Sequence, residues 1–166
     1  MTAGVVALLA ALAVAVIGGV VWQRTNGRMR ATEAVVHQPM AAGEGPGRSG
    51  TAAQGLTGED VGRPLGDRAT LVQFSSAFCA PCRATRRILA DVAGMTQGVA
   101  HVEIDAESRL DLVRQLNVLR TPTVLVLAGD GTIVRRASGQ PSKPDVIAAI
   151  GVAADYNSHI YDRDTR

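Results

Sequence analysis

Aromatic residues and cysteines are scarce in this sequence. Aromatics make up 3% of the 166 residues and hydrophobic residues 46%, so we expect an aliphatic core. Two cysteines are too few for the disulfide framework of a small secreted scaffold. A chain of this length can also fold without such crosslinks. Lysine is rare too, since sixteen of the 17 basic residues are arginine, which we interpret as a compositional bias.

Three functional classes lack their usual signals. The net charge is +2 and no basic run is interleaved with aromatics, so we expect no nucleic-acid binding. The histidines are His37, His101 and His159, and none forms the His-x-x-x-His spacing of a zinc site. No Gly-x-Gly-x-x-Gly stretch follows an expected strand, so we expect no nicotinamide or flavin cofactor.

A long uncharged run opens the chain. It covers Thr2 to Val21, TAGVVALLAALAVAVIGGVV, and Trp22 follows it. About 20 helical residues span a bilayer core, and tryptophan favours the membrane interface, so we expect a retained transmembrane anchor over residues 1–23. A cleaved signal peptide is the alternative, but the start carries no Lys or Arg and the apolar run is too long.

The residues after this run suggest the remaining organisation. Arginines directly follow the run, so the positive-inside rule predicts a single-pass protein with its C-terminal domain in the cytoplasm; the extracytoplasmic side is the alternative. Residues 24–55 are dense in Gly, Ala and Pro and predict a flexible juxtamembrane linker that includes His37. We expect one domain over residues 56–154 and a frayed polar tail over residues 155–166.

Apolar periodicity predicts an alternating α/β order within the domain. Strand patterns occur over 69–76, 99–105, 123–128 and 132–138, and Gly129-Asp130-Gly131 predicts a tight turn between the last two. Helical patterns occur over 56–62, 81–93, 108–116 and 144–154, the first capped by Thr57 and the last by Ser142. This order predicts parallel strands first and an antiparallel hairpin at the end.

Both cysteines lie in the stretch SSAFCAPCRATRR, residues 75–87. Cys79 and Cys82 could form half of a zinc site, two inert core thiols or a redox dithiol. Zinc lacks further ligands, and a proline between two thiols at a strand-to-helix junction is unusual for inert core residues. The pattern therefore favours a redox dithiol.

A thiol at the start of a helix gains acidity. Unpaired N–H groups and the helix dipole favour an anion at Cys79, and Pro81 fits the first turn because that turn leaves its N–H unpaired anyway. Arg83 and Arg86 lie one turn after the two cysteines and would stabilise a thiolate; a solvated helix face is the alternative. We expect Cys79 to be the nucleophile and Cys82, one turn further in, to resolve the mixed disulfide.

Several stretches together resemble the thioredoxin superfamily, in family order. They are LVQFSSAFCAPCRA (71–84), VEID (102–105), VLRTPTVLVL (118–127), GDG (129–131) and ASGQPSK (137–143). The resemblance implies a thioredoxin fold, a central mixed sheet flanked by helices, and with the N-terminal run it suggests the membrane-tethered, TlpA-like branch. It also implies a cis Thr121–Pro122 bond facing the dithiol, with the Thr121 backbone pairing with substrate and Gly139 near the same groove.

The sequence departs from the family pattern at three positions. Phe78 replaces the usual Trp before the first cysteine. Gln73 and His101 stand where the family often has a buried Asp and its Lys partner. Gln73 cannot accept a proton from Cys82, whereas His101 could titrate near neutral pH but is more often a packing residue in such a strand. Ala80, Pro81, Arg83 and Gln73 are therefore the expected tuning residues.

The resemblance implies a thiol–disulfide oxidoreductase that reduces protein disulfides. Its only redox group would be the dithiol, so electrons must come from a partner protein upstream. Thiolate stabilisation also favours oxidant behaviour, so the direction stays open. A non-catalytic thioredoxin-fold binding module and a dedicated thiol donor or oxidant for one client, such as a cofactor-assembly protein, are the alternatives.

Overall fold

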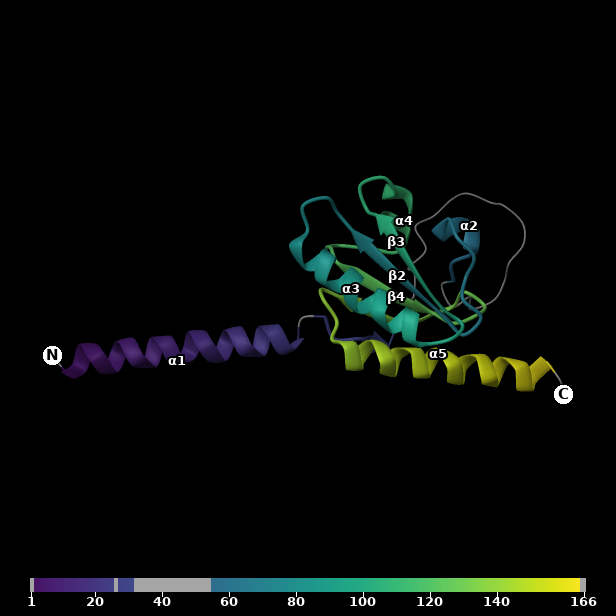
Figure 1. Ribbon diagram of the computed structural model, residues 1–166. Helices are drawn as coiled ribbons and strands as arrows, with labels where there is room; N and C mark the ends of the chain where they lie inside the picture. Colours follow the sequence, from purple (N-terminus) through teal and green to yellow (C-terminus); the bar gives the residue numbers. More distant parts are fainter. Residues whose placement is uncertain (1, 26, 32–54, 165–166) are drawn as a thin grey trace, which may run out of the picture.

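The computed structural model describes residues 2–25, 27–31 and 55–164 (Figure 1). The expected linker, including His37, falls largely in residues 32–54 and lies outside the described residues. In chain order the elements are α1 (Thr2–Thr25), β1 (Arg30–Ala31), α2 (Gly58–Val61), β2 (Ala69–Ser75), α3 (Ala80–Met95), β3 (Val99–Asp105), α4 (Leu110–Gln115), β4 (Thr123–Leu127), β5 (Ile133–Ser138) and α5 (Lys143–Asp164).

A mixed five-stranded sheet forms the centre of the fold. Its strand order is β1-β5-β4-β2-β3. Strands β2 and β3 are parallel, joined by α3, whereas β4 runs antiparallel to both β2 and β5. The predicted order of strands and helices, with the antiparallel hairpin at its end, is confirmed.

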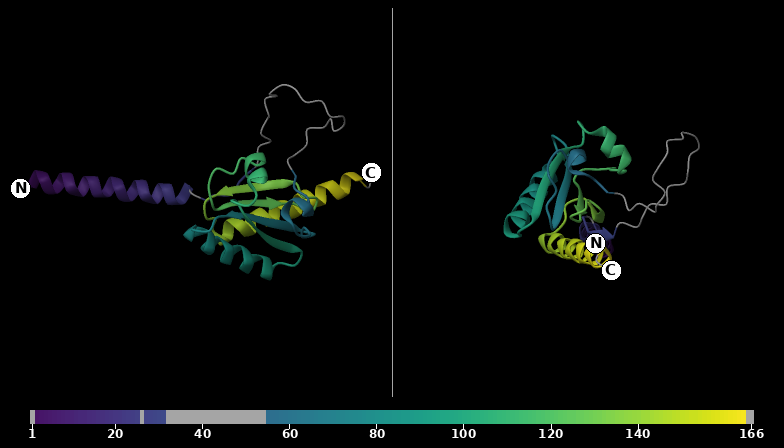
Figure 2. Two further views of the ribbon diagram at one scale, coloured as in Figure 1. Left: turned by 90° about the horizontal axis from the view of Figure 1, so that it is seen from above. Right: turned by 90° about the vertical axis from the view of Figure 1, so that its right-hand side faces the viewer.

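The sheet carries a hydrophobic core on each face. Helices α3 and α5 contact each other and pack on one face, while α2 and α4 lie on the other (Figure 2). All seven residues of β2 are buried, because this strand lies between β3 and β4 and under helices on both sides. The core is aliphatic apart from Phe74, as the composition predicts.

Two predicted local signals are confirmed. Thr57 and Asp60 form a capping box at the start of α2. The turn between β4 and β5 contains Gly131 at φ 88, and a Cβ there would lie 2.1 Å from the Leu56 carbonyl oxygen. Only glycine fits this turn without strain.

Residues 27–31 differ from the expected linker. Gly27 donates its N–H to the Ser138 carbonyl at 3.0 Å, and β1 pairs with β5 as an edge strand. Gly27 has φ 86, and a Cβ there would lie 1.9 Å from the Gln140 carbonyl oxygen. This segment therefore belongs to the sheet. A two-residue strand is too short to produce a periodicity that the sequence could reveal.

The C-terminal region also differs from the expected tail. Helix α5 continues to Asp164, ten residues beyond the predicted end of the domain at residue 154. Asn157 accepts a hydrogen bond from the Gly129 N–H at 2.9 Å and donates one to the Arg68 carbonyl at 3.0 Å. These contacts, together with Tyr156 packed against the core, join the first turn beyond residue 154 to the domain.

Helix α1 presents aliphatic side chains to solvent. Exposed fractions run from 44% at Val20 to 71% at Val14. Among the described residues, no helix combines the length and apolar character needed to cross a bilayer. The anchor expected over residues 1–23 stays a prediction.

Candidate active site

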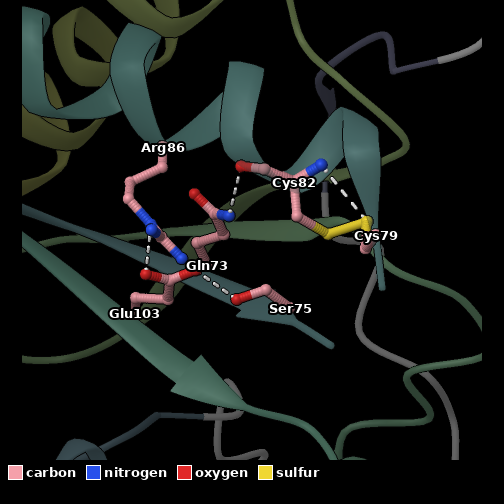
Figure 3. A network of polar contacts seen from close by, with 6 residues as sticks. All are labelled: Gln73, Ser75, Cys79, Cys82, Arg86 and Glu103. Atoms are coloured by element: carbon pink, nitrogen blue, oxygen red, sulfur yellow. Dashed lines mark hydrogen bonds and ion pairs between the residues drawn. A yellow bond between two sulfur atoms is a disulfide. The ribbon is translucent and has the colours of Figure 1, made fainter. Parts of the chain in front are cut away.

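The two cysteines form a disulfide at the start of α3 (Figure 3). Cys79 is the N-cap, and its sulfur lies 3.2 Å from the backbone nitrogen of Cys82, which donates to it. Ala80 and Pro81 occupy the first helical turn and are exposed. Cys79 is half-buried, whereas Cys82 is 2% exposed. Cys79 is therefore the more accessible sulfur, as the sequence predicts.

Local sequence explains why the helix begins here. Strand β2 delivers the chain to the dithiol loop, and the Cys79 N–H donates to the Ser76 carbonyl at 3.2 Å. Pro81 needs no hydrogen-bond acceptor, and its carbonyl accepts from the Thr85 hydroxyl at 3.0 Å. The free N–H groups of this first turn point to the end where Cys79 lies, which favours negative charge on its sulfur.

Gln73 lies beneath the dithiol helix. It is fully buried, and its amide nitrogen donates to the Cys82 carbonyl at 3.0 Å. Its Oε1 is buried without a hydrogen-bond partner in the structure. Gln73 therefore supports the backbone of the resolving cysteine and has no proton to exchange.

His101 lies on β3 beside Leu71 and is about half-buried. Burial lowers the pKa of its imidazole from the usual 6.5, and the Arg86 charge acts in the same direction while Glu103 opposes both. Its Nε2 is buried without a partner in the structure. The described residues that line the cleft beside the dithiol do not include His101.

Glu103 is the site residue that the sequence did not reveal. It stands opposite Gln73 on the parallel neighbour strand and accepts a hydrogen bond from the Ser75 hydroxyl (Figure 3). Arg86 binds both carboxylate oxygens, with Nε at 2.5 Å and Nη2 at 2.6 Å. Burial would raise the pKa of Glu103, but the hydrogen bonds from Arg86 and Ser75 and the Arg86 charge outweigh it and lower that pKa.

This ion pair separates the two expected tuning arginines. The Arg86 charge is balanced by Glu103, and the carboxylate raises the pKa of the guanidinium. Arg83 is exposed and has no ion-pair partner among the described residues. Of the two arginines, Arg83 therefore carries the unbalanced positive charge near the sulfurs.

A cleft of about 480 Å³ opens beside the dithiol. It is lined by Ser75, Ser76, Ala77, Cys79, Cys82, Arg83, Arg86, Glu103 and Asp105. Both cysteines face the same open space as two guanidinium groups and two carboxylates, and of these four groups only Arg86 and Glu103 form an ion pair.

The loop before β4 reaches the dithiol loop. The Thr121–Pro122 peptide bond is cis, and the Thr121 and Ser76 hydroxyls lie 3.0 Å apart. Gly139, at φ 99, donates its N–H to the Pro122 carbonyl at 2.7 Å. Phe78 is 98% exposed beside Cys79. The structure therefore brings Thr121 and Pro122 next to the dithiol loop, with Gly139 directly behind them.

A mixed sheet with a redox-type cysteine pair at the start of a flanking helix defines a class, that of the thiol oxidoreductases. The chain belongs to the thioredoxin family, whose family model, described as Thioredoxin, matches residues 59–151, more than half of the chain. No curated protein matches the sequence.

The fold is similar to several solved thioredoxins. A mutant thioredoxin from Halobacterium salinarum NRC-1 is 23% identical, with a TM-score of 0.49 over 53% of this chain and 76% of that chain. Thioredoxin F from spinach chloroplast is 21% identical, with a TM-score of 0.47 over 53% of this chain and 78% of that chain. At these scores the similarities add nothing to the family assignment.

Proposed function

We propose that this protein reduces disulfides in other proteins through Cys79 and Cys82. The observation that carries the proposal is the position of the pair, with Cys79 capping α3 at the mouth of a cleft and Cys82 buried one turn behind it. The helix start, the Cys82 N–H and the unbalanced Arg83 all favour a thiolate at Cys79.

The reaction needs no group beyond the two thiols. The Cys79 thiolate attacks one sulfur of the substrate disulfide, forming a mixed disulfide and releasing the other substrate sulfur as a thiolate that takes up a proton. Cys82 then loses its proton and attacks the Cys79 sulfur, which releases the second substrate thiol. The protein is left with the Cys79–Cys82 disulfide, and two electrons and two protons from an upstream donor protein restore the dithiol.

Substrate would bind across the exposed surface beside Cys79. Phe78 offers an apolar contact, and the Thr121 backbone would pair with an extended substrate segment, held in place by Pro122 and Gly139. Gln73 offers no titrating group beneath Cys82, so the proton of the Cys82 thiol would leave through the open cleft.

Insulin reduction tests the proposal with the full chain in mild detergent. With dithiothreitol as electron source, wild type should reduce insulin, and Cys79→Ser should abolish this activity. Cys82→Ser should trap mixed disulfides with substrate proteins, and the double variant Cys79→Ser/Cys82→Ser is the matched control that cannot trap. Undiminished activity in Cys79→Ser would contradict the mechanism, and an absence of trapped species would favour a binding module.

Direction of electron flow needs a separate measurement. Thioredoxins lie near −270 mV and strong oxidants of the DsbA type near −120 mV, so a reductase is expected at about the lower value. Equilibration of the pair with dithiothreitol or glutathione buffers measures it. A value near −120 mV would instead favour an oxidant, and trapping of a single client would favour a dedicated role such as cofactor assembly.

We also propose that residues 1–23 attach the protein to a membrane, as in the TlpA-like branch, with the domain on the cytoplasmic side. The uncharged run from Thr2 to Val21 and the exposed aliphatic surface of α1 support this. Resistance to carbonate extraction tests the attachment, and reporter fusions at the C-terminus distinguish the cytoplasmic from the extracytoplasmic side.

A further inference from the structure

A second hollow lies beyond the cis-proline loop. Its volume is about 390 Å³, and its lining residues are Asn117, Leu119, Arg120, Arg136 and Ser138. None of these residues is acidic, and neither arginine has a carboxylate within ion-pair distance among the described residues. Within the described part of the chain, the hollow therefore carries two guanidinium groups without a carboxylate partner.

Backbone carbonyls hold both arginines in place. Arg136 donates to the carbonyls of Leu116 and Asn117 at 2.6 and 2.7 Å, at the C-terminal end of α4. Arg120 donates to the Ser138 carbonyl at 2.7 Å. A guanidinium has five N–H groups, so both side chains keep donors for a further acceptor.

The hollow adjoins the proposed substrate groove. Arg120 directly precedes Thr121, whose hydroxyl lies 3.0 Å from that of Ser76. Ser138, which accepts from Arg120, precedes Gly139, which donates to the Pro122 carbonyl. A substrate segment that extends beyond Thr121 would pass over Arg120, and the 84% exposed Leu119 offers it an apolar contact.

We propose that Arg120 and Arg136 bind carboxylate side chains of the substrate protein, so that preferred clients carry acidic residues near the disulfide to be reduced. The inference rests on the proposed reductase function. Guanidinium groups match carboxylates in geometry as well as charge, and fixed ones lose little side-chain entropy on binding.

Paired peptide substrates test this inference with the fully reduced full chain. Each peptide contains one intramolecular disulfide flanked on both sides by three Glu residues or by three Gln residues. Wild type should show a second-order rate constant roughly twofold to fivefold higher for the Glu peptide at low salt, the upper part of the range expected for exposed ion pairs. The ratio should approach one in 1 M NaCl, where the screening length is about 3 Å.

Arginine variants locate the effect. Arg120→Gln should bring the Glu/Gln ratio down toward one, and Arg120→Glu should invert it. Arg63→Gln removes an equal charge from an exposed position outside the hollow and should keep the wild-type ratio. Arg120 is exposed and makes one side-chain hydrogen bond among the described residues, so these variants should fold. Thermal melts verify this.

The outcomes separate the two proposals. If wild type reduces both peptides equally at low salt, or if Arg120→Gln keeps the ratio, the acidic-client inference is overturned while the reductase function stands. If wild type reduces neither peptide, both the reductase function and the acidic-client inference that rests on it are overturned.

Discussion

Replacing Gln73 with methionine tests how the buried amide supports the dithiol. Two opposing effects decide the change in the free energy of unfolding. The Gln73 Oε1 is buried without a partner, and removing such an acceptor is worth about 1–3 kcal/mol. Losing the hydrogen bond from Nε2 to the Cys82 carbonyl costs about 1 kcal/mol. The cost is small because this carbonyl lies inside α3 and still accepts the backbone N–H four residues later.

The sum predicts that Gln73→Met leaves the oxidised protein unchanged in stability or about 1–2 kcal/mol more stable. Methionine has nearly the shape of glutamine, so no cavity or overpacking should offset this gain. Urea unfolding of oxidised wild type and variant, compared at equal m-values, measures the difference. A loss of more than about 1 kcal/mol would refute the reasoning, because it would require a partner for Oε1, such as a buried water.

The same variant tests the proton route from Cys82. Gln73 does not titrate, so Gln73→Met should keep the pH profile of mixed-disulfide resolution, measured by quenched-flow trapping. Gln73→Asp is the contrasting variant, since burial would raise the pKa of the new carboxyl above its unfolded value. The stability of Gln73→Asp should then fall as pH rises through the pKa of the new carboxyl in the folded protein. A resolution step that loses its pH dependence in Gln73→Met would contradict the cleft route.

Four further predictions concern three surrounding groups, His101, Glu103 and Phe78. The pKa of His101 is lowered by burial, so as pH falls below 6.5 the unfolded chain takes up a proton before the folded protein does, and the free energy of unfolding falls. His101→Gln should reduce this dependence of stability on pH, measured by urea titrations at a series of pH values. The pKa of Glu103 is lowered from 4.5, so its stabilisation is present above 4.5 and disappears as pH falls through the folded value. Glu103→Gln should reduce the acid-side slope, to which Asp60 and Asp111 also contribute because their pKa values are lowered too. The same Glu103→Gln change leaves the Arg86 charge without its carboxylate partner. Cys79 in the reduced protein should then be alkylated faster by iodoacetamide at pH 6. An unchanged rate would show that Arg86 is too distant or too screened to stabilise the Cys79 thiolate. Phe78 is 98% exposed, so Phe78→Ala should keep the melting temperature. It should lower kcat/KM for insulin roughly fivefold to thirtyfold, as expected for a lost aromatic contact in a binding surface. An unchanged kcat/KM would exclude Phe78 from the substrate-binding surface.

Short-range patterns in the sequence determined much of this protein. Apolar periodicity located four of the five strands, all except β1, and the helices of the domain to within a few residues, except for the C-terminal end of α5. The Cys-Ala-Pro-Cys spacing after a buried strand placed the dithiol at a helix start. These features depend on residues close together in the chain, where backbone preference and alternation of side chains are sufficient.

Only the tertiary structure decided which distant residues meet. Glu103 contacts Arg86 across 17 residues, and Arg136 reaches the end of α4 across 20. Pairing of β1 with β5 joins residues more than 100 positions apart. Such contacts follow from strand order and register, and neither is encoded in a local pattern. The sequence alone therefore predicted the cysteine pair at a helix start with Arg83 and Arg86 nearby, while packing of the sheet determined that Glu103 balances Arg86.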